Sequence, residues 1–404
     1  MKIKSLMRAA IAASFLSGTM LAGVAMADTA VKIGVLNDRS GIYADLSGEG
    51  SVVAARMAVE DFKAAEKGIT VEIVSADHQN KPDIASTIAR QWYDQEGVDM
   101  ITDVPTSSAA LAVNEITREK NKVFINSGAA TSDLTGKQCS PNTVHWTYDT
   151  YALAHGTGGA MVEAGGKKWF FLTADYAFGH ALERDTTAVV EAAGGEVVGS
   201  VRHPFPGTDF SSFLLQAQSS GADVIGLANA GGDTINSIKQ ASEFGITQGG
   251  QALAGLLVFL TDVHALGLDT AQGLVLTESF YWDLNDDTRA WSKRFAEAHD
   301  GDMPTMVQAG VYAGVLHYLN AIEAVGGKDP QAVMAKMKEM PTDDPLFGQG
   351  SVREDGRKLQ NMYLFKVKTP DQSKAPWDYY ELVATIPPEK AWRPLAEGGC
   401  PFVK

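Results

Sequence analysis

The chain has 404 residues, a formal net charge of −15 at pH 7 and two cysteines. This length is sufficient for two domains that each bury a core. The strongly negative charge argues against nucleic acid or an anionic membrane as a partner, because both are themselves negatively charged.

The N-terminal segment has the pattern of a secretory signal peptide. Basic residues up to Arg8 precede an apolar stretch over residues 9–24, and Ala25-Met26-Ala27 follows as a small-x-small cleavage site. A leader of this kind is removed on export. We therefore assign residues 1–27 to a cleavable signal peptide and expect a soluble mature protein in the periplasm.

Strands and helices alternate through the first third of the mature chain. Short apolar runs, typical of buried parallel strands, occur at residues 31–37, 69–75, 98–104 and 122–126. Between them apolar residues recur at helical spacing, as they do in residues 52–62. Regular alternation of this kind predicts a parallel, doubly wound sheet.

The loops after two neighbouring strands of this sheet are small and polar. Thr106, Ser107 and Ser108 follow the third strand and open a helix, and residues 127–131 follow the fourth strand. Ligands of open α/β sheets bind at the carboxyl ends of strands. A helix N-terminus with spare N–H groups favours a carboxylate or another anion. An ordinary capping role for the same residues remains open.

A second series of strands and helices begins after an irregular segment at residues 137–150. Its strands are expected at residues 168–174, 196–202, 223–228, 253–260 and 274–277. The sequence therefore predicts an α/β protein with two parallel-sheet lobes.

The chain then returns to the first lobe at residues 280–283. We assign residues 28–147 and 280–344 to the first lobe, and residues 148–279 and 345–404, with the C-terminal tail, to the second. Near the end, Asp355-Gly356 predicts a hairpin turn between strands at residues 350–353 and 362–367.

The sequence contains no recognisable nucleophile, zinc-binding or phosphate-binding motif. We therefore expect no enzymatic activity, no metal and no cofactor. Aromatic residues instead gather at the expected strand ends and crossings: Tyr43, Tyr176, Phe178, Phe280 and Tyr281. Each alone is compatible with core packing, but their shared placement indicates a ligand cleft.

The two cysteines, Cys139 and Cys400, are expected to form a disulfide, because a cysteine pair in an exported protein is usually oxidised. Two free buried thiols are the alternative. A metal site is disfavoured, because two isolated cysteines match no zinc spacing. A bridge would close a loop of ~260 residues and contribute roughly 5 kcal/mol at most in loop-entropy models.

Five segments carry a resemblance to a known family over nearly the whole mature chain. They are VKIGVLNDRSGIYADLSG, TSSAALAVNEI, KVFINSGAATSDLT, TADYAFGHALERD and TESFYWDLNDDTRAWSKRF. In this order they resemble the leucine/isoleucine/valine-binding type of ABC-transporter substrate-binding protein, a type I periplasmic binding protein. The resemblance implies two doubly wound lobes joined by three crossovers.

The resemblance also implies roles for particular residues. From the first lobe, four residues would hold a ligand carboxylate: Ser107, Ser108, Ala129 and Thr131. Aromatic side chains from both sides and from the return crossing would line the cleft: Tyr43, Tyr176, Phe178 and Phe280.

The second lobe departs from amino-acid-binding members, in which an acid and a tyrosine bind the ligand ammonium group. The matching loops here are Ala228-Asn229-Ala230-Gly231 and Leu256-Leu257, with Asn229 as their polar member. Asp233 or Asp262 would have to substitute from a neighbouring position. This departure makes a small organic acid, including an aromatic one, an alternative to an apolar amino acid as the ligand.

Together these features predict a monomeric periplasmic protein that closes over a small carboxylate and delivers it to an ABC permease in the inner membrane. One alternative is a periplasmic sensing subunit that presents its closed form to a receptor. Another is an exported hydrolase, for which the sequence shows no nucleophile with an oriented base.

Overall fold

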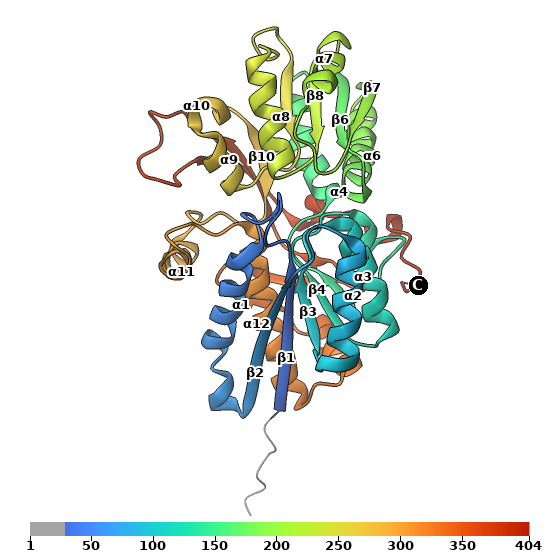
Figure 1. Ribbon diagram of the computed structural model, residues 1–404, viewed down its shortest axis with the longest axis vertical. Helices are drawn as coiled ribbons and strands as arrows, with labels where there is room; N and C mark the ends of the chain where they lie inside the picture. The colour runs from blue at the N-terminus through green and yellow to red at the C-terminus, as the bar shows by residue number, and fades with distance from the viewer. Residues whose placement is uncertain (1–28, 404) are drawn as a thin grey trace, which may run out of the picture.

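The structure is a computed structural model that describes residues 29–403, and these fold into two lobes stacked along the long axis of the molecule (Figure 1). The predicted signal peptide, residues 1–27, lies outside the described residues. The α/β prediction with two parallel-sheet lobes is confirmed.

The first lobe contains a five-stranded parallel sheet in the order β2-β1-β3-β4-β5. Its strands are β1 (Thr29–Asn37), β2 (Ile69–Asp77), β3 (Met100–Asp103), β4 (Val123–Asn126) and β5 (Thr143–His145). Successive side chains point to opposite faces, so Met100 and Ile101 belong to different core clusters. Burial on both faces explains why these strands are short, nearly continuous apolar runs.

Helices from two distant parts of the chain cover this sheet. One face carries α2 (Pro82–Gln91) and α3 (Ser107–Glu119), and the other carries α1 (Gly48–Phe62) and α12 (Met306–Val325). The helices α11 (Asp286–Ala298) and α13 (Pro330–Glu339) pack beside α1 and α12. Short 3₁₀ or π segments complete the lobe at residues 64–67, 92–96 and 132–135.

The second lobe contains a four-stranded parallel sheet in the order β7-β6-β8-β9. Its strands are β6 (Lys168–Ala174), β7 (Glu196–His203), β8 (Val224–Ala228) and β9 (Ala252–Gly255). Its helices are α4 (Thr150–Leu153), α5 (Gly159–Glu163), α6 (Ala177–Ala192), α7 (Ser211–Ser219), α8 (Gly232–Glu243), α9 (Leu260–Leu266) and α10 (Leu268–Ala271), with a π segment at residues 154–158. The neighbouring residues Trp169 and Phe170 of β6 point to opposite faces of the sheet. Trp169 belongs to the same hydrophobic core as α6, and Phe170 to the same core as α7, so helices cover both faces.

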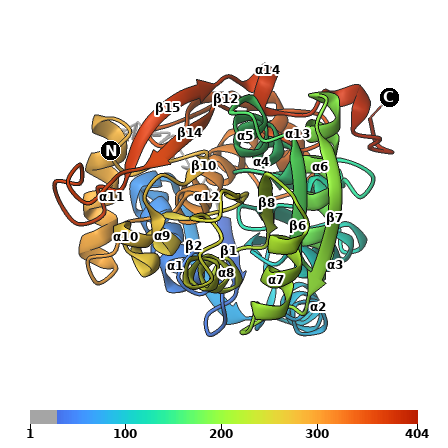
Figure 2. The same cartoon turned by 90° about the horizontal axis from the view of Figure 1, so that it is seen from above.

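The chain passes between the lobes three times: before α4, after β10 (Val275–Glu278) and before β14 (Met362–Val367). An antiparallel sheet, β10-β14-β15, runs alongside the second lobe, with β15 (Tyr380–Ile386) at its edge (Figure 2). The sequence placed the first of these strands, at residues 274–277, in the parallel series. That strand, β10, instead pairs with β14 from near the end of the chain, and local periodicity does not reveal such a distant partner.

Three further expectations differ from the structure. The strand expected at residues 253–260 ends at Gly255, and the chain then turns into α9. The hairpin at Asp355-Gly356 joins β12 (Gly348–Val352) to β13 (Lys358–Leu359), not to β14. With β11 (Thr342–Asp344), these strands pack beside α13 and β5, so residues 345–359 lie with the first lobe rather than the second.

The C-terminal tail returns from the second lobe to the first. After β15 it forms α14 (Pro388–Ala391) and a 3₁₀ turn at residues 395–397, and it ends in the predicted disulfide between Cys139 and Cys400. The buried guanidinium of Arg357 lies over the ring of Trp392, with its Cζ atom 4.2 Å from the centre of that ring. The Nη1 atom of Arg357 lies 3.5 Å from Oδ2 of Asp149, so the first and third crossings are held together.

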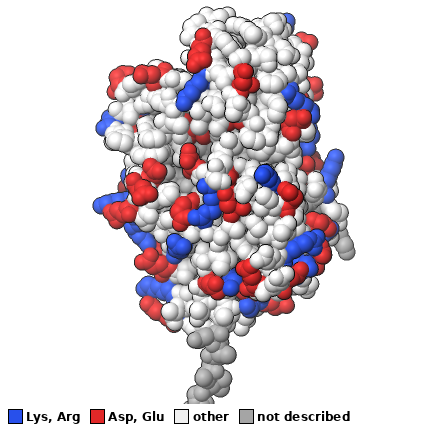
Figure 3. Space-filling model, in the orientation of Figure 1, with Lys and Arg blue, Asp and Glu red and all other residues white. Residues whose placement is uncertain are grey.

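Neither sign of charge dominates the side of the surface shown in Figure 3. Acidic and basic side chains are interspersed there over both lobes (Figure 3). Among residues 29–403, no helix is long and apolar enough to cross a membrane.

Candidate functional site

A cavity lies between the two lobes, where the carboxyl ends of both parallel sheets face each other. It comprises about 220 Å³ of empty space, counting its opening to solvent. Eleven residues line it: Tyr43, Leu46, Pro105, Gly128, Ala130, Tyr148, Tyr176, Phe178, Ala230, Leu257 and Phe259. No charged side chain is among them, so the cavity wall is aromatic and apolar.

Two tyrosines join the lobes at this cavity. The hydroxyl oxygens of Tyr43, after β1, and Tyr176, after β6, lie 2.6 Å apart. The ring of Phe205 stacks on Tyr176 with ring centres 4.0 Å apart. Burial raises the pKa of both tyrosines, so their hydroxyls stay neutral and can each donate and accept.

The loop that carries Tyr43 is held by the carboxylate of Asp38. Its Oδ1 atom accepts from the backbone N–H of Gly41 at 2.8 Å, and its Oδ2 atom accepts from that of Tyr43 at 2.9 Å. The neighbouring carbonyl of Ile42 then accepts from the N–H of Gly232 in the second lobe at 3.3 Å. Tyr43 therefore lies on a hydrogen-bonded turn that itself contacts the opposite lobe.

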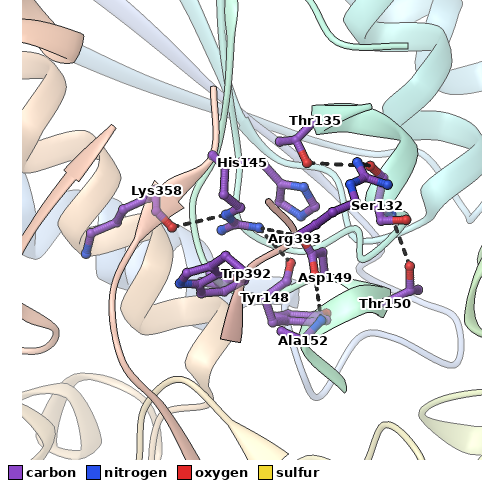
Figure 4. A network of polar contacts seen from close by, with 12 residues as sticks. Ser132, Thr135, His145, Tyr148, Asp149, Thr150, Ala152, Lys358, Trp392 and Arg393 are labelled. Carbon is purple, nitrogen blue, oxygen red and sulfur yellow. Dashed lines mark hydrogen bonds and ion pairs between the residues drawn. The ribbon is translucent and has the colours of Figure 1, made fainter. Parts of the chain in front are cut away.

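A second polar contact joins the lobes at Ser132, whose backbone N–H donates to Oγ1 of Thr150 at 3.1 Å (Figure 4). Oδ2 of Asp185, on α6, accepts hydrogen bonds from Oγ of Ser132 at 2.7 Å and from Oγ1 of Thr150 at 2.6 Å. The guanidinium of Arg184 lies 3.3 Å from a carboxylate oxygen of Asp133. Ser132 and Asp133 of the first lobe are thus in direct contact with α6 of the second lobe.

The four residues expected to hold a carboxylate are close together but do not line the cavity. The Oγ atom of Ser107 accepts from the backbone N–H of Thr131 at 3.2 Å. The N–H of Ala129 donates to Oδ1 of Asn126 at 3.1 Å. Ser108 is half-buried in the first turn of α3. Between them, Gly128 and Ala130 reach the cavity wall.

Three residues expected from the second lobe and the return crossing do not line the cavity and have structural partners instead. Asn229 donates to Nε2 of His203 at 3.2 Å or to Oγ of Ser237 at 3.1 Å. Oδ2 of Asp262 accepts from the N–H of Phe259 at 2.9 Å, at the start of α9. Phe280 packs against Trp291 and Phe347. By contrast, the expected aromatic residues Tyr43, Tyr176 and Phe178 all reach the cavity.

Sequence reasoning missed several residues of the wall. Tyr148 lies in the first crossing, donates to the carbonyl of Gly128 at 2.5 Å and packs edge-on against Phe259, with ring centres 5.9 Å apart. Its position in an irregular segment gave no periodic signal. Phe259 was assigned to a strand, although the chain leaves the sheet four residues earlier.

Buried acidic groups lie close to the cavity without lining it. Burial raises the pKa of Asp103, at the end of β3, to about 6, and that of Asp233, on α8, to about 7. Burial likewise raises the pKa of Asp262 to about 7. Among residues 29–403, no group of three or more His, Cys, Asp or Glu side chains is arranged to hold a metal ion.

Comparison with known sequences decides the family. The sequence model of the family described as periplasmic binding protein matches residues 30–374. The chain belongs to the periplasmic binding protein family.

Relatives of this binding protein include proteins named for the binding of leucine, isoleucine and valine. It is 29% identical over 368 residues to the Leu/Ile/Val-binding protein homolog 6 of Brucella melitensis, an alignment that covers 87% of this chain and 91% of the relative. The protein is therefore a ligand-binding protein of the periplasmic binding protein family.

Solved structures support the same assignment. A periplasmic binding protein of Burkholderia mallei is 53% identical, with a TM-score of 0.91 and coverage of 94% of this chain and 100% of that one. A branched-chain amino acid ABC transporter ligand-binding protein of Burkholderia xenovorans is 42% identical, with a TM-score of 0.82 and coverage of 92% and 99%. An R. palustris solute-binding protein in complex with 4-hydroxybenzoate is 25% identical, with a TM-score of 0.81 and coverage of 90% and 98%.

Proposed function

We propose that this periplasmic binding protein takes up a small carboxylate without an α-amino group, aromatic acids being favoured, and delivers it to an inner-membrane ABC permease. The observation that carries the proposal is the cavity between the lobes, whose wall is apolar and rich in aromatic rings. A flat apolar ligand would bury its ring there, because aromatic pairs gain from both area and geometry.

The first lobe offers the groups that suit a carboxylate. Helix α3 begins at Ser107. The side chain of its N-cap residue, Thr106, accepts no hydrogen bond from the backbone N–H groups of the first turn. The backbone N–H groups of such a turn favour an anion. The turn containing Gly128 and Ala130 lies beside it, and both of these residues line the cavity.

The second lobe supports a ligand without an ammonium group. Ala230 and Leu257 contribute to its part of the wall, and neither can pair with a buried cation. An unpaired ammonium group buried against apolar side chains would be strongly unfavourable. The 4-hydroxybenzoate named for the R. palustris protein is a ligand of the proposed class, whereas the name of the B. xenovorans protein points to branched-chain amino acids.

Delivery would use the contact between the lobes. Binding of a ligand to the first lobe would favour closure of the second, which brings Tyr176 to Tyr43 and Asp185 to Ser132. The closed form would then dock on the permease. We further propose that the protein acts as a monomer in the periplasm, after cleavage that leaves Asp28 as the first residue.

A thermal-shift screen of the mature protein tests this function. The panel comprises benzoate, 4-hydroxybenzoate, aliphatic acids, leucine, isoleucine and valine. A true ligand at ~100 times its Kd should stabilise the protein by roughly 2.7 kcal/mol. We expect an acid without an α-amino group to give this shift. Stabilisation by leucine, isoleucine or valine alone would contradict the proposed ligand class.

A further inference from the structure

Asp103 is a buried carboxyl group at the end of β3. Its Oδ2 atom accepts from Nδ2 of Asn37 at 3.0 Å and from Oγ of Ser47 at 2.7 Å. Its Oδ1 atom is also buried, and the only polar groups beside the carboxyl apart from Asn37 and Ser47 are the hydroxyls of Ser51 and Ser127 among the described residues. A buried carboxylate in this situation is unfavourable unless it is paired or becomes neutral.

The groups around Asp103 carry no positive charge. Polar neighbours come from β1, from the first turn of α1 and from the turn after β4: Asn37, Ser47, Ser51 and Ser127. Helix α12 approaches that turn with Gly310. Tyr148 faces Asp103 from the first crossing, and burial raises the pKa of this tyrosine, so it stays neutral. No lysine, arginine or histidine in residues 29–403 is an ion-pair partner of Asp103.

Asp103 lies directly behind the cavity wall. A Cβ atom placed on Gly128 would be 2.8 Å from Oδ1 of Asp103 and 2.6 Å from Cα of Pro105. Both Gly128 and Pro105 line the cavity. A negative charge in the cavity would therefore lie close to Asp103 across an apolar wall, where charges interact more strongly than in bulk water.

We propose that Asp103 couples anion binding to protonation: when a carboxylate enters the cavity, Asp103 takes up a proton and is retained as the neutral acid. The inference rests on the proposed function, because it requires an anionic ligand. The hydroxyls of Ser51 and Ser127 beside Asp103 can donate to the carboxylate or accept from the neutral acid, so the site accommodates both forms of the group.

The direction of the effect follows from the charges. Burial already raises the pKa of Asp103 to about 6, so the group is mostly ionised at neutral pH. A nearby carboxylate raises the pKa of an acid further, because two like charges repel. Protons are therefore taken up on binding, and by linkage the affinity falls as the pH rises above about 6, by up to about tenfold per pH unit.

Isothermal titration calorimetry with benzoate tests the coupling. Titrations near neutral pH in two buffers of different ionisation enthalpy give the number of protons bound with the ligand. The wild type should take up a fraction of one proton, and Asp103→Asn should take up none while still binding benzoate. Asp233→Asn and Asp262→Asn are matched controls, because both acids are buried with a raised pKa and neither lies behind Gly128. Both controls should retain the uptake.

Several results would overturn the inference. These are an absence of proton uptake in the wild type, uptake that survives in Asp103→Asn, or uptake that disappears in Asp233→Asn instead. Benzamide, which has no charge, should bind without proton uptake. If benzoate does not bind at all, the proposed function is in question. Asp103 is then judged separately by ¹³C NMR titration of its carboxyl group in the wild type, where an ordinary pKa near 4 overturns the inference.

Discussion

The hydroxyl oxygens of Tyr43 and Tyr176 lie 2.6 Å apart, and this hydrogen bond connects the first lobe to the second. Both side chains also line the interlobe cavity, so the same two residues connect the lobes and form part of the cavity wall. Ligand binding and lobe closure therefore share a contact, and substitutions there should affect both.

Replacing Tyr176 with phenylalanine should weaken binding without unfolding the protein. The substitution removes one hydrogen bond between neutral groups, worth about 0.5–1.5 kcal/mol, and keeps the ring that stacks on Phe205. Affinity should fall by roughly three- to tenfold in calorimetry. Tyr151→Phe is the control, because that ring stacks on His155 within the second lobe. An equal loss in both variants would show that the interlobe bond is not the cause.

A methyl group at position 231 should block closure. Gly231 has φ +56°, and a Cβ there would lie 2.5 Å from the carbonyl oxygen of Ile42 in the opposite lobe. Gly221 has a similar φ of +74° but no atom within 4 Å of the same position, so Gly221→Ala reproduces the backbone strain alone. We expect both variants to lose stability and only Gly231→Ala to lose ligand-induced compaction in small-angle X-ray scattering. Normal compaction in Gly231→Ala would exclude this contact from the closed form.

The overall architecture could be predicted because it depends on local patterns. Short apolar runs and helical spacing indicated both parallel sheets, and the cysteine pair in an exported chain indicated the disulfide, which is confirmed. Strand ends also placed Tyr43, Tyr176 and Phe178 near one cleft, and these residues meet at the cavity.

The remaining features depend on contacts that local patterns do not contain. β10 looked like a member of the parallel series, but it pairs antiparallel with β14, about ninety residues later. Asp103 looked like part of a buried strand, and only the folded chain places its carboxyl behind Gly128. Ser107 and Thr131 matched a family pattern, yet their groups bond to each other within the first lobe.

The carboxylate-binding role of the first lobe is tested by comparing neighbouring serines. Ser107→Ala leaves the buried N–H of Thr131 without its acceptor, which should lower the free energy of unfolding by about 1–3 kcal/mol. Ser108→Ala alters a half-buried side chain and should change stability less. We expect at least one serine variant, and Thr131→Val, to lose more binding free energy than the loss in their free energy of unfolding explains. Calorimetric binding and ligand-free urea unfolding measure the two effects. Unchanged affinity in all three variants would move the carboxylate away from these loops.

The disulfide should stabilise the fold without shaping the cavity. Cys139 and Cys400 are separated by 261 residues, and neither lines the cavity. A Cys139→Ser, Cys400→Ser double variant should lose up to roughly 5 kcal/mol of unfolding free energy and retain its affinity. The check is urea unfolding beside calorimetry. A large loss of affinity at unchanged stability would instead assign the tail a role in closure.

Calorimetry with matched acid and amide ligands tests the central claim most directly. Benzoate and benzamide, or 4-hydroxybenzoate and its amide, have nearly the same shape and differ in charge at one end. Each hydrogen bond to a charged group is worth roughly 1.5–3 kcal/mol, so the acid should bind about ten- to a hundredfold more tightly than its amide. Equal affinity for acid and amide, or tight binding of α-amino acids alone, would contradict the account.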